Sequence, residues 1–170
     1  MVQHPIPPVI STNPKSPSRV LILGSFPSVK SRETGFFYGH PQNRFWRVLA
    51  ALWAEPVPTT VSEKITFCHA HGIALWDVIA SCEIRGSSDA SIQNVTPTDL
   101  APLLAPGTIQ TIFTNGTTAT RLYTKYQYPQ THIPATPLPS TSPANAVRTL
   151  DALIEAWSPL KTALDLHQIT

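Results

Sequence analysis

Residues 19–28 read RVLILGSFPS, and this stretch decides the fold class. The apolar run at 20–23 is continuous rather than alternating, and it stops at Gly24. Such a run is typical of a strand that is covered on both faces, as the strands of a parallel sheet are. The Gly, Ser and Pro residues that follow predict a sharp turn out of the strand. The stretch therefore predicts the first inner strand of an α/β sheet, with a loop at its carboxyl end.

Further strands and helices alternate along the rest of the chain. Apolar segments predict strands at 73–78, 109–114 and 132–136, and Pro134 favours a sheet edge for the last of them. Residues 83–96 are expected to form a polar loop. Alternation of this kind predicts a three-layer α/β/α fold around a central, mainly parallel sheet of about four strands. Helices are expected at 41–53, with Pro41 in the first turn, from the N-cap Ser62 to Gly72, at 97–104 and at 115–126. A last helix is expected with Ser142 as its N-cap, and its apolar stripe consists of Val147, Leu150, Ile154 and Trp157.

Length and composition fit one domain of this kind. The chain has 170 residues, of which 42% are hydrophobic and 13% are charged, and its net charge is +2. Residues 1–18 are rich in Pro, Ser, Thr and Asn, so we expect an extended tail or cover strap, followed by a single domain at 19–170. The N-terminal segment lacks the apolar core of a signal peptide, and no apolar run approaches the ~20 residues of a membrane helix. These features predict a cytoplasmic protein.

The cysteines and histidines do not indicate a metal site. Cys68 and Cys82 are expected to be free, buried thiols, and two cysteines are too few for a four-cysteine iron–sulfur cluster. On a helix, Cys68, His69 and His71 point in different directions, which argues against a shared metal ion. The small positive net charge does not identify a nucleic-acid partner, but it excludes a strongly acidic protein that would repel phosphate.

Three loops lie where an open α/β sheet binds its ligands, beyond the carboxyl ends of the strands. Residues 24–28 (GSFPS) match neither a phosphate-binding P-loop, nor a dinucleotide fingerprint, nor a serine-hydrolase turn. Residues 35–46 (GFFYGHPQNRFW) combine aromatic rings, an amide and a cation, which suit a nucleobase and a phosphate, although core packing also explains the rings. Residues 138–145 (LPSTSPAN) offer hydroxyl and backbone donors for a phosphate, or form an ordinary capping turn.

In this order and spacing, the three motifs resemble those of the uracil-DNA glycosylase superfamily, and most of all its hypoxanthine-DNA glycosylase branch, often called family 6. The resemblance runs from about Val20 to Ala156. It implies the fold of that superfamily and hydrolysis of the N-glycosidic bond of a deaminated base, hypoxanthine first and uracil second, flipped out of DNA. The implied partner is double- or single-stranded DNA carrying such a base, bound by a monomer with no membrane, no obligate protein partner, and no metal or organic cofactor.

The resemblance also assigns roles to individual residues. In mismatch-specific uracil glycosylases the first loop reads Gly-Ile-Asn-Pro-Gly and its Asn helps to activate water, but Phe26 stands at that position here. The family-6 branch is similar, and Asn43 aligns with its catalytic asparagine; whether Asn43 orients water or stabilises the leaving base stays open. Tyr38 aligns with the aromatic residue that stacks on the flipped base. Further base contacts are expected from Gly24, Ser25, Phe26 and Asn115, DNA contacts from Pro27, Ser28, His40, Ser140, Thr141 and Ser142, and supporting roles from Asp77, Arg85, Ser87 and Asp89.

Two other functions remain open from the sequence. A non-catalytic module that binds single-stranded nucleic acid would use the same aromatic residues and loops, and the missing asparagine of the first loop allows it. A nucleoside hydrolase on the same fold would act on free nucleosides. If the chain is a glycosylase, we expect a monofunctional one, because a strand-cleaving enzyme needs a pocket lysine for a Schiff base and Lys30 lies in a solvated loop.

Overall fold

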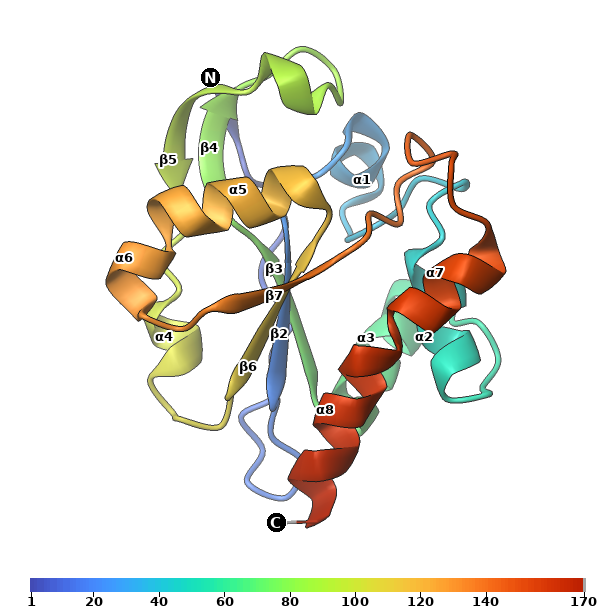
Figure 1. The fold of residues 1–170 in the computed structure, drawn as a ribbon. Coiled ribbons are helices and arrows are strands. Elements are labelled where there is room, and N and C mark those ends of the chain that lie inside the picture. The colour runs from blue at the N-terminus through green and yellow to red at the C-terminus, as the bar shows by residue number, and fades with distance from the viewer. Residues whose placement is uncertain (170) are drawn as a thin grey trace.

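Four parallel strands form the central sheet, in the order β3-β2-β6-β7. They are β2 (Val20–Gly24), β3 (Ile73–Asp77), β6 (Thr111–Asn115) and β7 (Ala135–Leu138). The computed structural model describes residues 1–169, with side chains for residues 1–166. Gly24 pairs with Asp77, and Asn115 pairs with Leu138, so the carboxyl ends of the strands meet along one edge (Figure 1). The predicted three-layer architecture with a parallel sheet is confirmed.

Alternate side chains of β2 enter two separate cores, one on each face of the sheet. Val20 and Ile22 belong to one hydrophobic cluster, and Leu21 and Leu23 belong to the other. This division follows from the opposite orientation of successive side chains in a strand. The first face is covered by α2 (Phe45–Leu52), α3 (Val61–His71), α7 (Leu150–Ala156) and α8 (Ser158–Ile169), and the second by α4 (Ala101–Leu104), α5 (Thr117–Tyr126) and α6 (Tyr128–Thr131) (Figure 1).

A second, antiparallel sheet corrects the expected loop at 83–96. It consists of β1 (Val2–Gln3), β4 (Ile79–Glu83) and β5 (Gln93–Pro97), in the order β1-β4-β5. Between β4 and β5 lies a short 3₁₀ helix, Asp89–Ser91. Strand β5 reads QNVTP, is mostly exposed, and pairs with β4 through two register shifts. Because a strand that buries so little needs no apolar pattern, the sequence did not reveal it.

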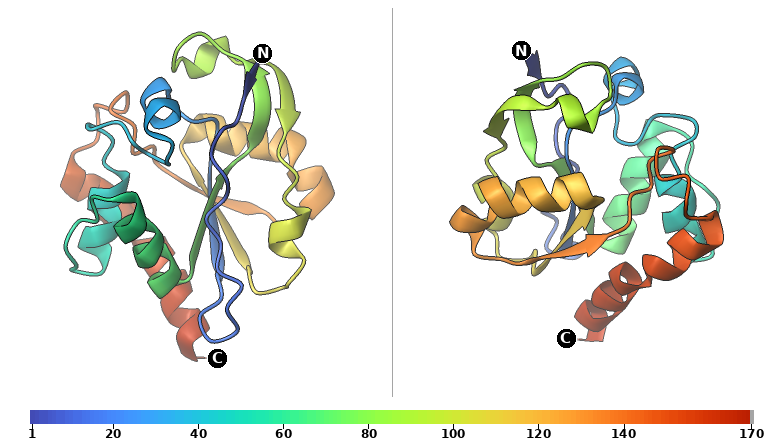
Figure 2. Two further views of the ribbon diagram at one scale, coloured as in Figure 1. Left: turned by 180° about the vertical axis from the view of Figure 1, so that it is seen from behind. Right: turned by 45° about the horizontal axis from the view of Figure 1, so that its top comes forward.

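The N-terminal residues 1–18 run along the outer edge of β3 (Figure 2). The backbones of Val9 and Leu75 exchange two hydrogen bonds of 2.9 Å, and the side chains of Ile6 and Val9 are buried. The segment therefore covers the unpaired groups of the edge strand, which otherwise invite pairing with another chain. It also reaches β4 through β1, so it touches both sheets.

Several helix starts differ from those that the sequence predicts. Helix α2 begins at Phe45 rather than Pro41, because the side chain of Asn43 bonds the Phe45 N–H and holds residues 41–44 in a turn. Helix α3 is capped by Thr60 rather than Ser62, and it ends at Gly72 as predicted. Helix α4 begins at Ala101 rather than at 97.

The last helical region differs most from its prediction. Thr149, not Ser142, caps α7, and its hydroxyl accepts a hydrogen bond from the Ala152 N–H. Val147 is 95% exposed and is not part of the apolar stripe, whereas Trp157 is fully buried. The sequence offers several Ser and Thr caps in this region, and only packing selects one of them. Residues 139–149 therefore form a long loop. Within residues 1–169 no helix combines the length and the apolarity that a membrane crossing needs.

Candidate active site

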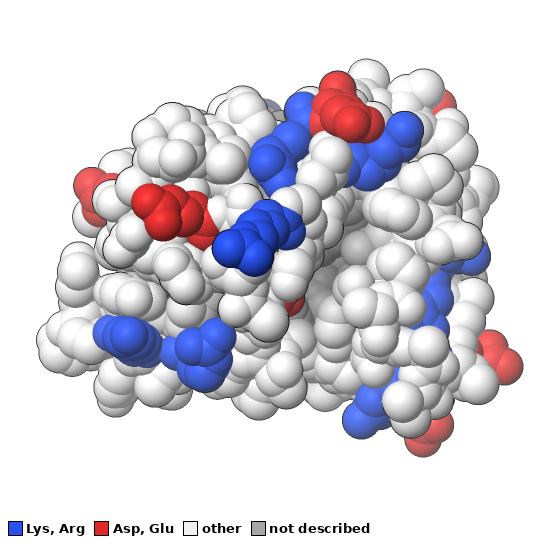
Figure 3. Space-filling view, turned by 90° about the horizontal axis from the view of Figure 1, so that it is seen from above, with Lys and Arg blue, Asp and Glu red and all other residues white. Residues whose placement is uncertain are grey.

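A pocket of about 400 Å³ opens at the carboxyl edge of the central sheet. Figure 3 shows the hollow on this face, with Lys and Arg side chains on more than one side of it. The loops after β2 and β7, the loop between β4 and β5 and the segment before α2 contribute to its wall, together with the last residues of β3 and β6, Asp77 and Asn115. Of the residues predicted from the sequence, the structure brings fourteen into the lining: Gly24, Ser25, Phe26, Pro27, Ser28, Tyr38, Asn43, Asp77, Ser87, Asp89, Asn115, Ser140, Thr141 and Ser142.

Two predicted residues lie outside this lining. His40 shapes the turn before α2, where its Nδ1 accepts from the Gln42 N–H and its carbonyl oxygen accepts from the Asn43 N–H. Arg85 is exposed on the far side of the loop between β4 and β5. The sequence prediction missed the lining residues Ser31, Phe37, Ile84, Ser88 and Ala144, which carry no chemical signature of their own.

Asn43, Thr141 and Asn115 form a continuous hydrogen-bonded chain across the pocket. The Thr141 hydroxyl donates to Asn43 Oδ1 (2.9 Å) and accepts from Asn115 Nδ2 (3.0 Å). The Thr141 N–H donates to Asn115 Oδ1 (3.1 Å), and Thr141 is fully buried. Thr141 is therefore a structural link, and the Asn115 amide is engaged by it on both its oxygen and its nitrogen.

The amide of Asn43 has a defined orientation. Its Oδ1 accepts from the Phe45 N–H (3.0 Å) as well as from Thr141. Because a backbone N–H can only donate, the atom that faces it is the amide oxygen and not the nitrogen. The oxygen thus carries two hydrogen bonds, and the NH₂ group is the part of the side chain left to serve the pocket.

Arg44 clamps the loop 139–149 instead of serving as a free cation. Its guanidinium donates to the carbonyl oxygens of Ser142, Asn145 and Arg148, with 2.8 Å to Asn145. Its backbone N–H donates to the Thr141 carbonyl (3.1 Å). Several hydrogen bonds from one planar group fix both the position and the angle of the loop.

We expect Arg44→Ala to loosen this loop, because it removes the charge-assisted hydrogen bonds that hold the loop carbonyls. Trypsin reports the loop directly, because Arg148 is exposed within it and should be cut faster in the variant. Arg47→Ala is the matched control, since among the described residues the Arg47 guanidinium makes one hydrogen bond, a long one of 3.5 Å to the Gln42 carbonyl. Unchanged cleavage after Arg148 would contradict the clamp.

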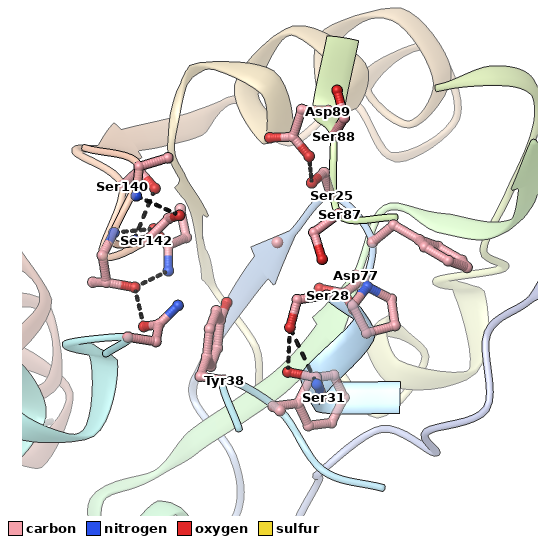
Figure 4. Close-up of a pocket in the computed structure, with 18 of the residues that line it drawn as sticks. Ser25, Ser28, Ser31, Tyr38, Asp77, Ser87, Ser88, Asp89, Ser140 and Ser142 are labelled. Atoms are coloured by element: carbon pink, nitrogen blue, oxygen red, sulfur yellow. Dashed lines mark hydrogen bonds between the residues drawn. The ribbon is translucent and has the colours of Figure 1, made fainter. Parts of the chain in front are cut away.

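Tyr38 stands at the centre of the pocket, between the two groups of loops (Figure 4). Its ring stacks on Phe45, with 3.9 Å between ring centroids and 20° between planes, so one face is already covered. Its backbone has φ 54°, a left-handed conformation that is unusual for an aromatic residue. Its hydroxyl is buried without a hydrogen-bond partner among the described residues. Burial, together with the nearby Asp77, raises the pKa of Tyr38, which keeps the hydroxyl protonated.

Asp77 and Gly24 meet on the pocket floor. Asp77 is 4% exposed, and its Oδ1 lies so close to Gly24 that a Cβ there would be 2.5 Å away. The same Cβ would lie 3.2 Å from the Tyr38 hydroxyl. Glycine at position 24 therefore leaves the space in which the carboxylate and the phenol converge.

The loop between β4 and β5 forms the opposite wall and is tied to α1 (Val29–Thr34). The Val29 N–H donates to the Ser87 hydroxyl (2.9 Å), and Arg32 donates to the Gly86 carbonyl (2.6 Å). Asp89 faces the pocket and accepts from the Ser25 hydroxyl (3.4 Å) (Figure 4). Burial raises the pKa of Asp89, although neighbouring hydroxyls and Arg121 oppose the shift.

The fold and the pocket together define an α/β/α protein with a polar, partly aromatic pocket at its strand ends, the place where open α/β sheets bind their ligands. A family model described as the uracil DNA glycosylase superfamily matches residues 11–161. The chain belongs to this superfamily.

Relatives and a solved structure agree with the assignment. The hypoxanthine DNA glycosylase of Methanosarcina barkeri is 33% identical over 95 residues, which cover 55% of this chain and 58% of that protein. The protein of the same name from Methanosarcina acetivorans is 33% identical over 104 residues, 61% of this chain and 63% of that protein. The chain thus spans less than two thirds of the curated relatives that it matches. A solution NMR structure from M. acetivorans, of a protein proposed to be a uracil DNA glycosylase, has a TM-score of 0.74 and 26% identity, and the match covers 95% of this chain and 99% of that one.

Proposed function

We propose that the protein is a DNA glycosylase that removes a deaminated base, with hypoxanthine preferred over uracil. The observation that carries the proposal is the fixed Asn43 amide, whose NH₂ group is left for the pocket that Tyr38 also lines. A base that stacks on Tyr38 would place its edge within reach of such a donor. The two curated relatives, both named hypoxanthine DNA glycosylase, support the choice of base.

The chemistry is hydrolysis of the N-glycosidic bond. The target nucleotide leaves the duplex, because its C1′ is shielded there. As the bond between C1′ and the base nitrogen breaks, its electron pair goes to the base, and the sugar becomes an oxocarbenium ion to which water adds with loss of a proton. A donor aimed at the leaving base stabilises the charge that develops on it. With its oxygen already bonded twice, Asn43 supplies a donor and not an acceptor, so we assign it to the leaving base and not to water activation.

The pocket floor suits hypoxanthine better than adenine, the base from which it forms. Deamination replaces an amino group by a carbonyl and places a proton on the adjacent ring nitrogen. Asp77 offers a carboxylate oxygen on the floor, and such an oxygen accepts from that N–H but repels the lone pair of adenine. Polar readout of this kind discriminates strongly, because the wrong base leaves a buried group unpaired.

An excision panel tests the proposal. Duplex and single-stranded oligonucleotides carrying deoxyinosine, deoxyuridine or deoxyxanthosine are incubated with the protein, and abasic sites are cleaved by alkali. We expect deoxyinosine to react fastest. DNA binding without excision of any base would instead indicate a binding module, and hydrolysis of free inosine without activity on DNA would indicate a nucleoside hydrolase.

Tyr38→Ala should slow excision by about 10-fold to 100-fold, because base–aromatic stacking contributes roughly 1–3 kcal/mol. Tyr38→Phe should be nearly silent, since the ring is kept and the lost hydroxyl has no hydrogen-bond partner among the residues that the structure describes. Single-turnover rates on deoxyinosine duplex measure both variants. If Tyr38→Phe is as slow as Tyr38→Ala, the hydroxyl and not the ring face is what matters.

We also expect a monofunctional enzyme that leaves the abasic strand intact. Strand cleavage through a Schiff base needs a lysine in the pocket. No lysine is among the described residues of the lining, and Lys30, on the neighbouring α1, lies 3.8 Å from Glu33. Borohydride added during the reaction should trap no covalent adduct. A trapped adduct that is lost in Lys30→Gln would contradict this expectation.

A further inference from the structure

A histidine of the N-terminal segment lies directly beneath the pocket. His4 Nε2 is 2.7 Å from Asp77 Oδ2, although the two residues are 73 positions apart, and each side chain is 5% exposed. The imidazole also packs against the rings of Phe26 and Phe37, with centroid distances of 5.7 and 6.1 Å. Asp77, Phe26 and Phe37 all line the pocket, so His4 supports three of its lining residues from behind.

The hydrogen bonds of His4 fix which ring nitrogen carries the proton. The Ile6 N–H donates to His4 Nδ1 (3.2 Å), so Nδ1 presents a lone pair. In a neutral imidazole the proton then resides on Nε2, which donates to Asp77 Oδ2. This donation holds one carboxylate oxygen and leaves Oδ1, which lies beside the pocket residue Gly24, as the available acceptor.

The backbone of the segment places His4 before any ligand arrives. The His4 N–H donates to the Ala80 carbonyl (2.8 Å), one residue beyond the pairing of β1 with β4. On the other side, the buried Val9 pairs with Leu75, two residues before Asp77 in β3. The backbone on both sides of His4 is thus anchored, to β4 and to β3, the strand that ends at Asp77, and little freedom remains to be lost on binding.

We infer that His4 is a positioning residue of the active site: through its Nε2–H it orients Asp77, so the N-terminal segment completes the base pocket. The inference rests on the proposed glycosylase function. Both ring nitrogens of His4 are hydrogen-bonded, and one of the partners is a carboxylate of the pocket. A histidine outside a site commonly orients a side chain of the site through such a pair of hydrogen bonds. Without His4 the carboxylate can rotate, and Oδ1 no longer has a set direction.

Single-turnover excision of deoxyinosine from duplex separates this role from simple packing. His4→Ala should lower the rate by roughly 10-fold or more, the scale of losing a hydrogen bond to a charged group. His4→Gln should recover most of the rate, since its amide can donate to Asp77 from a similar position. Val9→Ala is the control, because it weakens the same segment and lowers the melting temperature without touching Asp77. Its excision rate should stay within about 3-fold of wild type.

A double-mutant cycle tests whether His4 acts through Asp77. Adding His4→Ala to Asp77→Ala should cost almost nothing further, whereas independent effects would multiply. If the wild-type protein excises the base and His4→Ala is nearly as fast, the inference about His4 is overturned while the proposed function stands. The same follows if His4→Ala and Val9→Ala lose equal amounts of activity. If the wild-type protein excises no deaminated base, the proposed function fails and the catalytic role of His4 falls with it.

The proton assignment has a readout that needs no activity. Long-range ¹H–¹⁵N spectra of the wild-type protein should show His4 with a protonated Nε2 and an unprotonated Nδ1, and Asp77→Ala should shift the Nε2 signal. A proton on Nδ1 instead would overturn the inference whatever the protein excises.

Discussion

Replacing Asn43 with Ala should lower single-turnover excision by about 10²-fold or more, the scale of losing one donor that stabilises a transition state. Binding to a duplex that already contains an abasic site should change far less, because the donor is needed when charge develops on the leaving base. Part of any loss will be structural, since Asn43 Oδ1 also holds Thr141 and the start of α2. A second substitution is needed to separate the two contributions.

Asn43→Asp provides that separation. A carboxylate keeps an oxygen for the Thr141 hydroxyl and the Phe45 N–H, so the loop and the helix start remain in place. It removes the NH₂ donor and puts an acceptor there instead. We therefore expect a normal melting temperature and an excision rate as low as that of Asn43→Ala. An Asn43→Asp enzyme as fast as wild type would show that Asn43 acts on water as an acceptor.

Gly24→Ala should have an effect of similar size for a different reason. The new Cβ would lie 2.5 Å from Asp77 Oδ1 and 3.2 Å from the Tyr38 hydroxyl, so both side chains must move. A displacement of about 1 Å in a catalytic site can cost on the order of 10²-fold in rate. Excision of deoxyinosine should fall by this factor.

Gly107→Ala controls for loss of stability. Gly107 has φ +77°, and an added Cβ meets nothing within 4 Å, so Ala strains only the backbone there. It should lower stability by about 1 kcal/mol and leave excision unchanged. Unimpaired excision by Gly24→Ala would show that Asp77 and Tyr38 need not keep their places.

The sequence predicts those parts of the site that follow directly from strand order. The apolar run of β2 identifies an inner parallel strand, and the rule that ligands lie beyond strand ends brings Gly24, Asp77 and Asn115 to one edge. These three residues lie close together because parallel strands end at the same edge of the sheet. The same reasoning extends to Ser140 and Ser142, which follow the last strand.

The parts that sequence did not predict depend on side chains that meet without any local pattern. Arg44 has the sequence neighbours of a phosphate-binding cation, but its guanidinium is engaged by loop carbonyls about a hundred positions away. His4 lies in a Pro-rich segment with no periodicity, and only the pairing of β1 with β4 brings it under Asp77. Strand β5 is polar because it is exposed, so its pairing leaves no hydrophobic signal.

In the proposed glycosylase, the hydrogen bond between Thr141 and Asn43 would couple recognition of the DNA to cleavage of the glycosidic bond. Thr141 belongs to the loop 139–149, in which Val147 is 95% exposed, and the Thr141 hydroxyl donates to Asn43 Oδ1 at 2.9 Å. A DNA strand that presses on this loop would therefore also move the Asn43 amide. DNA substrates that hold the loop in different positions would then differ more in excision rate than in binding affinity. Discrimination measured from rates would therefore exceed discrimination measured from equilibrium binding.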